Sequence, residues 1–164
     1  VLIGMMGVGK STIGRLLSKS LEKPFEDLDE RVEMRESLKI YEIFDKKGEA
    51  YFRSIEESEC LKIIKENGKI IALGGGTFIN NNLREQIKKT CFSIWLDLAP
   101  DKIFERIKKN KNRPLLKNTD SIKDVENIYL NRKKIYALAD YKLDCNLKKI
   151  EDISSEIEKI YENI

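Results

Sequence analysis

The chain opens with the stretch VLIGMMGVGKST, which is Val1–Thr12. Within it, Gly4–Ser11 reads G-x-x-x-x-G-K-[ST] between an apolar run and an amphipathic segment, a pattern that predicts a strand, a phosphate-binding loop and a helix. Glycines let successive backbone N–H groups close around phosphate oxygens, where a Cβ would block the approach. Lys10 adds a positive charge near the β- and γ-phosphates, the Ser11 hydroxyl is a ligand for Mg²⁺, and the helix N-terminus favours an anion. The stretch therefore predicts a nucleoside triphosphate site.

The phosphate loop by itself leaves the class of protein open. A glycine-rich turn also precedes helices by chance, although the strand–loop–helix context weakens that alternative. Motor ATPases, GTP-dependent switches and small-molecule kinases all carry such a loop, so the rest of the chain has to choose among them.

Length and composition suit one soluble α/β domain. The 164 residues are 41% hydrophobic and 36% charged, and they are enough to bury a substantial core. No apolar run reaches the ~20 residues of a membrane helix, and the opening run is too short for a signal peptide. The net charge is only +3, with Lys and Glu interspersed, which argues against a nucleic-acid surface. We expect a cytoplasmic monomer with small-molecule partners and neither a membrane nor a nucleic-acid partner.

The cysteines and the lack of histidine restrict the chemistry. Cys60, Cys91 and Cys145 are far apart and form no C-x-x-C pair, and with no histidine in the chain a zinc site is not expected. We expect them to be reduced core residues. Because histidine is the commonest general base, any side chain that accepts a proton here is expected to be a carboxylate.

Two further stretches join the phosphate loop at the ends of predicted strands. Phe25–Asp29 alternates apolar and acidic residues, which predicts a strand end whose Asp27 and Asp29 point to the same side. Lys69–Leu73 reads as a buried strand that runs into Gly74–Gly76, where the backbone has to approach something closely. Ligands bind at the carboxyl ends of parallel strands, so all three stretches are expected at one site.

Apolar spacing predicts the remaining elements. Helices are expected over Ser11–Leu21, Arg31–Ser37, Ile40–Asp45, Glu49–Glu66, Asn81–Lys88, Pro100–Lys109, Asp120–Asp140 and from Ile150 to Ile164, with further strands over Cys91–Asp97 and Tyr141–Cys145. Five strands alternating with helices predict one parallel sheet covered on both faces. The polar and basic stretch Asn110–Thr119 is predicted to be a mobile lid.

Six short motifs occur along the chain in an order that is typical of one enzyme family. They are GMMGVGKST at 4–12, DLD at 27–29, Phe52-Arg53 with Glu56, GGG at 74–76, RPLL at 113–116, and Arg132 followed by Tyr136. With them the chain resembles the shikimate kinase family over nearly its whole length. The resemblance implies a transferase that moves the γ-phosphate of ATP to the 3-hydroxyl of shikimate, on the way to chorismate and the aromatic amino acids. It also implies a three-layer P-loop kinase fold similar to nucleoside-monophosphate kinases, with a five-stranded parallel sheet in the order 2-3-1-4-5.

The resemblance further implies roles for single residues within one domain, residues 1–164. The phosphate loop would be residues 4–12, the substrate-binding region about 27–60 and the lid about 109–119. Asp29, Lys10 and Arg113 are expected to be catalytic, and Mg²⁺ is expected as cofactor at Ser11 and Asp27. The expected nucleotide-binding residues are Gly7, Val8, Gly9, Lys10, Ser11, Thr12, Arg106 and Arg113, and the expected substrate-binding residues are Asp29, Arg53, Gly75, Gly76 and Arg132.

The chemistry of shikimate, a small ring with one carboxylate and three hydroxyls, suits these residue types. Guanidinium groups bind carboxylates through paired hydrogen bonds, which suits Arg53 and Arg132 to the acid end. One carboxylate can accept from two neighbouring hydroxyls, which suits Asp29 to the hydroxyl end. Arg113, carried by the lid, would offset charge on the phosphoryl group in transfer.

Each assignment has a structural alternative that the sequence leaves open. Arg53 lies four residues from both Glu49 and Glu57, a spacing typical of surface ion pairs. Arg132 lies on a charged helix and Arg106 on another, so both are candidates for plain solvent-exposed residues. The two acids at the strand end also suit a solubilising role, and the three glycines a tight turn.

Two functional alternatives remain at this point. The first is another small-molecule kinase of the same fold, such as a gluconate or nucleoside-monophosphate kinase. The second is a nucleotide-dependent switch, which would need an N-K-x-D motif and a D-x-x-G at the end of a strand. Neither occurs in those positions, and a nucleotide acceptor would need more arginines than the substrate side offers.

Overall fold

Five strands form one parallel sheet in the computed structural model, which describes residues 1–109 and 121–163. The strand order is β2-β3-β1-β4-β5, which confirms the predicted order 2-3-1-4-5. Leu2 in the central strand pairs with Ala72 on one side and Ile94 on the other. The strands are β1 (Leu2–Ile3), β2 (Phe25–Asp27), β3 (Ile70–Ala72), β4 (Ile94–Asp97) and β5 (Tyr141–Asp144).

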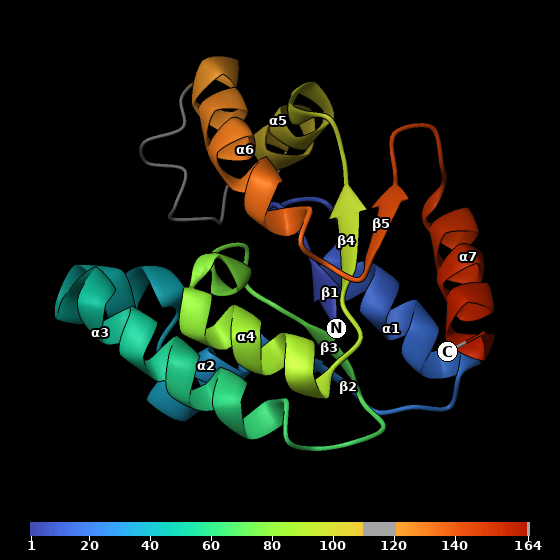
Figure 1. The fold of residues 1–164 in the computed structure, drawn as a ribbon. Coiled ribbons are helices and arrows are strands. Elements are labelled where there is room, and N and C mark those ends of the chain that lie inside the picture. The colour runs from blue at the N-terminus through green and yellow to red at the C-terminus, as the bar shows by residue number, and fades with distance from the viewer. Residues whose placement is uncertain (110–120, 164) are drawn as a thin grey trace.

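Helices cover the sheet in the three-layer arrangement that the sequence predicts. They are α1 (Lys10–Ser20), α2 (Leu28–Glu36), α3 (Ile40–Ile63), the 3₁₀ helix η1 (Thr77–Ile79), α4 (Asn81–Thr90), α5 (Pro100–Lys108), α6 (Ile122–Tyr136) and α7 (Ile150–Glu162). In Figure 1, α1 and α7 lie together on one side of the sheet and α3 and α4 on the other, while α5 and α6 lie beyond the carboxyl end of β4. Helices thus cover both faces of the sheet, and a further pair lies beyond the end of β4.

The predicted strand end at 25–29 is corrected by the structure. β2 stops at Asp27, and Asp29 belongs to the first turn of α2. The Asp27 carboxylate Oδ1 accepts hydrogen bonds from the N–H groups of Asp29 and Glu30 at 3.0 and 3.4 Å, so Asp27 is the N-cap of α2. A capping acid followed by a buried Leu28 favours a helix start over continued strand. Asp27 and Asp29 therefore do not alternate on one strand.

Two other boundaries differ from the sequence prediction. The helices expected at 40–45 and 49–66 form one run, α3, with a kink at Gly48, whose φ of 81° and ψ of 167° are not helical. Gly48 therefore interrupts the helical geometry as expected, but the helix continues directly after it. The short helix η1 was not predicted, because a three-residue turn carries no periodic signal.

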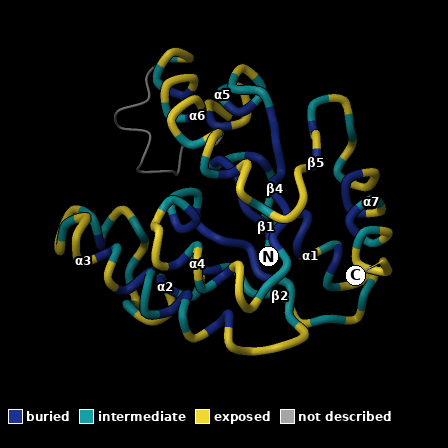
Figure 2. The backbone as a smooth tube through the Cα atoms, in the orientation of Figure 1, coloured by how far each residue is buried: buried dark blue, intermediate teal, exposed yellow. Residues whose placement is uncertain are grey.

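The buried side chains form a main core around the sheet and a smaller one beside it. Trp95, Tyr136 and Phe78 are the largest fully buried residues of the main core, and Figure 2 shows the buried trace running through the central strands. The second cluster lies between α2 and α3 and consists of Val32, Ile43, Phe52 and Ile55. Because α2 and α3 have an apolar cluster of their own, they are held to each other as well as to the sheet.

The cysteines agree with the expectation of reduced thiols. Cys60 and Cys145 are buried and Cys91 is partly buried, all three as free cysteines. Burial raises the pKa of Cys60 and of Cys145 to about 12, which makes both thiols unreactive at neutral pH. Across residues 1–109 and 121–163, no helix is long and apolar enough to cross a membrane.

Candidate active site

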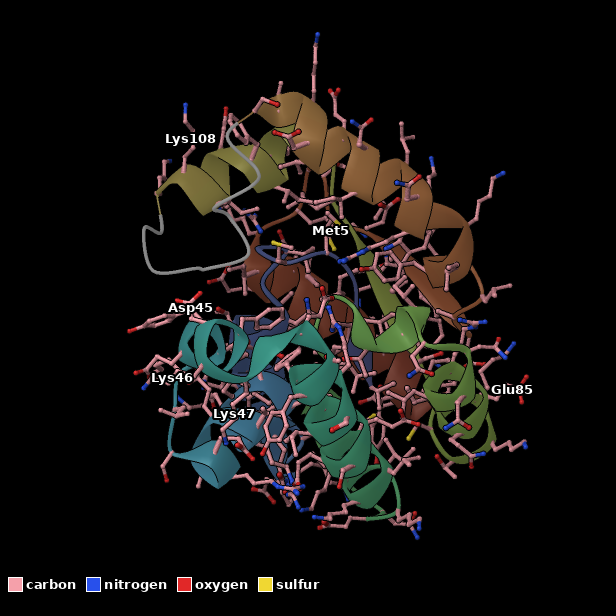
Figure 3. The ribbon with its side chains drawn as sticks, turned by 90° about the vertical axis from the view of Figure 1, so that its left-hand side faces the viewer. Met5, Asp45, Lys46, Lys47, Glu85 and Lys108 are labelled. Carbon is pink, nitrogen blue, oxygen red and sulfur yellow. The ribbon has the colours of Figure 1, made fainter. Side chains whose placement is uncertain are left out.

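The phosphate loop joins β1 to α1 with a backbone that requires glycine. Gly4, Gly7 and Gly9 have φ angles of 139°, 79° and 105°, and a Cβ on Gly4 would lie 2.7 Å from the Leu96 carbonyl oxygen. Lys10 reaches back along the loop, where its Nζ donates to the carbonyls of Gly4 and Met5 at 2.9 and 3.0 Å. In Figure 3, Met5 lies in the loop between α5 and α6 on one side and α3 on the other.

Ser11 and Asp27 meet beside this loop. The Ser11 hydroxyl donates to Asp27 Oδ2 at 2.5 Å, while the other carboxylate oxygen caps α2. A hydroxyl and a carboxylate are the hard oxygen ligands that Mg²⁺ prefers, so these two residues fit the expected ion. The described part of the chain has no group of three or more His, Cys, Asp or Glu side chains that would hold a metal. An ion here would therefore depend on water and phosphate oxygens for its remaining ligands.

Each glycine of the triplet faces a different predicted site residue. A Cβ on Gly74 would lie 2.8 Å from Asp29 Oδ1, one on Gly75 would lie 3.4 Å from Arg132 Nη1, and one on Gly76 would lie 2.8 Å from Arg53 Nη1. The Gly75 position also lies 3.3 Å from the Met6 backbone nitrogen in the phosphate loop. The acid and both arginines therefore converge on the triplet, next to the phosphate loop. A tight turn alone would not explain this close packing.

Arg53 combines the two alternatives that the sequence left open. Its guanidinium pairs with exposed Glu49 at 3.3 Å, as the i,i+4 spacing suggests, and its Nη1 donates to Glu56 at 2.8 Å. Glu57, the other acid at this spacing, instead accepts from Asn82 Nδ2 at 2.7 Å. Burial disfavours the charge on Arg53, but Glu56 and Glu49 outweigh it and raise the pKa of this guanidinium. The group therefore stays cationic while it lies against Gly76.

Glu56 is a site residue that the sequence analysis did not assign. Its side chain is 4% exposed, and its two oxygens accept from Arg53 Nη1 at 2.8 Å and from Thr77 Oγ1 at 2.7 Å. A buried carboxylate between a helix and the glycine loop fixes the direction of the arginine. The i,i+3 spacing of Arg53 and Glu56 in the sequence already suggests an ion pair, but this spacing alone does not reveal that Glu56 is buried.

Arg132 points to the glycine triplet and is not a plain surface residue. It is half-buried, and its Nη1 donates to the Gly75 carbonyl at 3.0 Å. Arg106 instead lies at the outer side of the phosphate loop, where its Nη1 donates to the Val8 carbonyl at 3.0 Å. Arg113 and the predicted lid at Asn110–Thr119 fall on residues 110–120, outside the described residues.

An ion-pair network ties α2 to α3. Glu59, 5% exposed at its side chain, accepts from Arg31 at 2.8 Å, Arg35 at 2.6 Å and Lys62 at 2.8 Å. Burial alone would raise the pKa of Glu59, but the hydrogen bonds from Lys62, Arg31 and Arg35 lower it to about 2. The network holds the helix that carries Asp29 against the helix that carries Arg53.

Comparisons with known proteins identify the family of the chain. A family model described as shikimate kinase matches residues 6–162. A shikimate kinase of Aquifex aeolicus is 40% identical over 156 residues, which are 95% of this chain and 91% of that protein. The solved shikimate kinase of Acinetobacter baumannii in complex with shikimate superposes with a TM-score of 0.93 at 28% identity, covering 99% of this chain and 91% of that one. A gluconokinase from Sinorhizobium meliloti reaches a TM-score of only 0.57 at 14% identity and shares the fold alone.

Proposed function

The chain belongs to the shikimate kinase family, and we propose that its site transfers the γ-phosphoryl group of ATP to the 3-hydroxyl of shikimate, giving shikimate 3-phosphate and ADP. One observation carries this proposal. Asp29, Arg53 and Arg132 converge on three successive glycines, and the middle glycine lies against the phosphate loop. One acid and two guanidinium groups suit an acceptor with neighbouring hydroxyls and a carboxylate.

The acceptor side would bind and orient shikimate. Arg53 and Arg132 would pair with its carboxylate. Gly76 lies beside Arg53 and Gly75 beside Arg132, and without side chains these two glycines would let a backbone N–H group approach the same acid. Asp29, next to Gly74, would accept from the hydroxyl that attacks the γ-phosphorus and hold it in line. Phosphoryl transfer has a loose transition state, so orientation of this hydroxyl is the main contribution that we assign to Asp29.

The nucleotide side would stabilise charge on the phosphates. Gly7, Val8 and Gly9, with Thr12 at the start of α1, would direct backbone N–H groups to the β-phosphate. Lys10 would leave the loop carbonyls and neutralise the β- and γ-phosphates, and Arg113 would add a second positive charge.

Mg²⁺ would be held at Ser11 and Asp27, where it would supply positive charge that offsets the negative charge of the phosphates. Ser11 would be the direct hydroxyl ligand, and Asp27 would accept from the water shell of the ion. Arg106, bonded to the Val8 carbonyl at the rim of the loop, is our proposed contact for the adenine.

The test is ADP release in a coupled assay with shikimate, gluconate, CMP or no acceptor. We expect turnover with shikimate at least ~100-fold above each other arm, because only shikimate matches one acid and two guanidiniums. Lys10→Met, which should lose transition-state charge stabilisation, is the negative control and is expected below a tenth of wild-type activity. Faster turnover with gluconate or CMP would contradict the proposal.

A further inference from the structure

Tyr136 is a fully buried side chain that contacts the glycine triplet. It lies on α6 with 0% exposure, and its ring packs against Trp95 with centroids 6.0 Å apart. Its hydroxyl donates to the Gly75 carbonyl at 2.5 Å. Arg132, one turn earlier on the same helix, donates to the same oxygen at 3.0 Å. Two side chains of α6 thus donate hydrogen bonds to the same oxygen, the Gly75 carbonyl.

The Gly75 carbonyl differs from its neighbours in this respect. The carbonyls of Gly74 and Gly76 accept from the backbone N–H groups of Thr77 and Ile79, at 3.1 and 3.0 Å. Gly75 is bonded to side chains of a helix far away in the sequence. Because three consecutive glycines have unusual conformational freedom, their orientation depends on such external contacts.

Fixing this carbonyl also fixes the next amide. The peptide between Gly75 and Gly76 is planar and trans, so the Gly76 N–H points opposite to the Gly75 carbonyl. Gly76 in turn lies against Arg53. A rotation of this one peptide would therefore move the Gly76 N–H and remove the oxygen that Arg132 uses.

We propose that the Tyr136 hydroxyl is a positioning group for the acceptor site, which holds the Gly75–Gly76 peptide and thereby keeps the Arg132 guanidinium, its partner on the Gly75 carbonyl, oriented toward the acceptor carboxylate. The inference rests on the proposed function and adds a residue to it. Burial raises the pKa of Tyr136, although Arg132 works against the shift, so the hydroxyl remains a donor at neutral pH. Tyr136 itself does not touch the acceptor in this arrangement and is not a catalytic residue.

The chain offers a matched control on the same helix. Tyr129 lies seven residues before Tyr136, is 9% exposed, and donates its hydroxyl to Asp97 Oδ1 at 2.9 Å. Tyr129→Phe and Tyr136→Phe each delete one hydroxyl and one hydrogen bond from α6 and keep the ring. They differ in that only Tyr136 is bonded to the glycine triplet. Asp97 keeps a second partner, Lys142 at 2.9 Å, in the Tyr129 variant.

The experiment measures steady-state kinetics with shikimate and ATP varied separately, together with thermal unfolding of each variant. We expect Tyr136→Phe to raise the KM for shikimate about three- to tenfold, the usual effect of one lost hydrogen bond, and the KM for ATP less than about twofold. Tyr129→Phe should leave both KM values within about twofold of wild type at a comparable loss in Tm. Equal KM values in the two variants would refute the role of Tyr136. So would a Tyr136→Phe protein that is unfolded at the assay temperature while Tyr129→Phe is folded.

A double variant tests whether Tyr136 acts through the peptide that Arg132 shares. In an Arg132→Lys background, Tyr136→Phe should raise the shikimate KM by less than it does alone, because the two side chains act on one carbonyl. Strictly multiplicative effects would overturn the shared mechanism. A wild-type protein that does not turn over shikimate would refute the proposed function instead, whatever Tyr136 does.

Discussion

The Ser11 hydroxyl lies 2.5 Å from Asp27 Oδ2, and Oδ1 of the same carboxylate caps the helix that carries Asp29. One side chain thus connects the phosphate loop to the acceptor helix. We propose this carboxylate as a partner of Mg²⁺, so its replacement should be seen first in the metal requirement.

Asp27→Asn should raise the Mg²⁺ concentration for half-maximal activity at least about threefold, because the amide removes the charge that faces the ion. The readout is activity against free Mg²⁺ at saturating ATP. Glu30→Gln is the matched control, since it removes a charge from the same helical turn, and the Glu30 carboxylate pairs with exposed Arg15 instead of with Ser11. An equal Mg²⁺ dependence in both variants would contradict a metal role for Asp27.

Asp29→Asn should lower kcat/KM for shikimate by at least ~100-fold, since the attacking hydroxyl loses its charge-assisted acceptor. ATP affinity should change less than about threefold, because Asp29 lies against Gly74 on the acceptor side. Steady-state kinetics and separate nucleotide binding distinguish the two effects. Wild-type turnover, or the same defect as in Asp27→Asn, would show that the two acids are wrongly assigned.

Arg53→Lys and Arg132→Lys should each raise the KM for shikimate about tenfold or more with little change for ATP, because lysine keeps the charge but loses the paired hydrogen bonds. Arg15→Lys is the control, as its pair with Glu30 is exposed at the surface. A parallel rise in both KM values would point to a general loss of structure.

Gly76→Ala should raise the shikimate KM about tenfold with a small effect on Tm. The φ of Gly76 is −99°, which alanine adopts readily, but the added Cβ would lie 2.8 Å from Arg53 Nη1. Gly68→Ala should instead lower the Tm and leave the shikimate KM unchanged. Its φ of 74° strains a residue with a side chain by about 1 kcal/mol, while the added Cβ meets nothing within 4 Å. Unchanged shikimate kinetics in Gly76→Ala would place the acceptor elsewhere.

Stability should fall in acid because of Glu59. The pKa of this carboxyl is lowered to about 2 in the folded protein, so its stabilisation is complete above the unfolded value near 4.5 and is lost as pH falls toward 2. Glu59→Gln should lose roughly 1 to 2 kcal/mol at pH 7, less than full linkage gives because the cationic partners are partly in solvent. The free energy of unfolding against pH is the measurement. If the difference in free energy of unfolding between wild type and Glu59→Gln stays constant from pH 7 to 2.5, ionisation of Glu59 is not the cause of the acid sensitivity.

Local signals explain why much of the fold was predictable. Glycine spacing in the phosphate loop and apolar periodicity are properties of adjacent residues, and they placed all five strands and most helices close to their observed bounds. The predicted boundaries of strands and helices were wrong where a single side chain changed the local preference for strand or helix. Asp27 ends β2 by capping α2, which an apolar–acidic alternation does not reveal.

The sequence by itself determined the phosphate loop, the parallel α/β sheet and the family, because these depend on short motifs and their order along the chain. Only the tertiary structure decided which side chains share a site. Gly75 receives donors from Arg132 and Tyr136, 57 and 61 residues away, and Glu56 becomes a buried partner of Arg53 only when η1 packs against α3. Burial and hydrogen-bond partners at such distances are set by how helices pack on the sheet, and no local spacing encodes that packing.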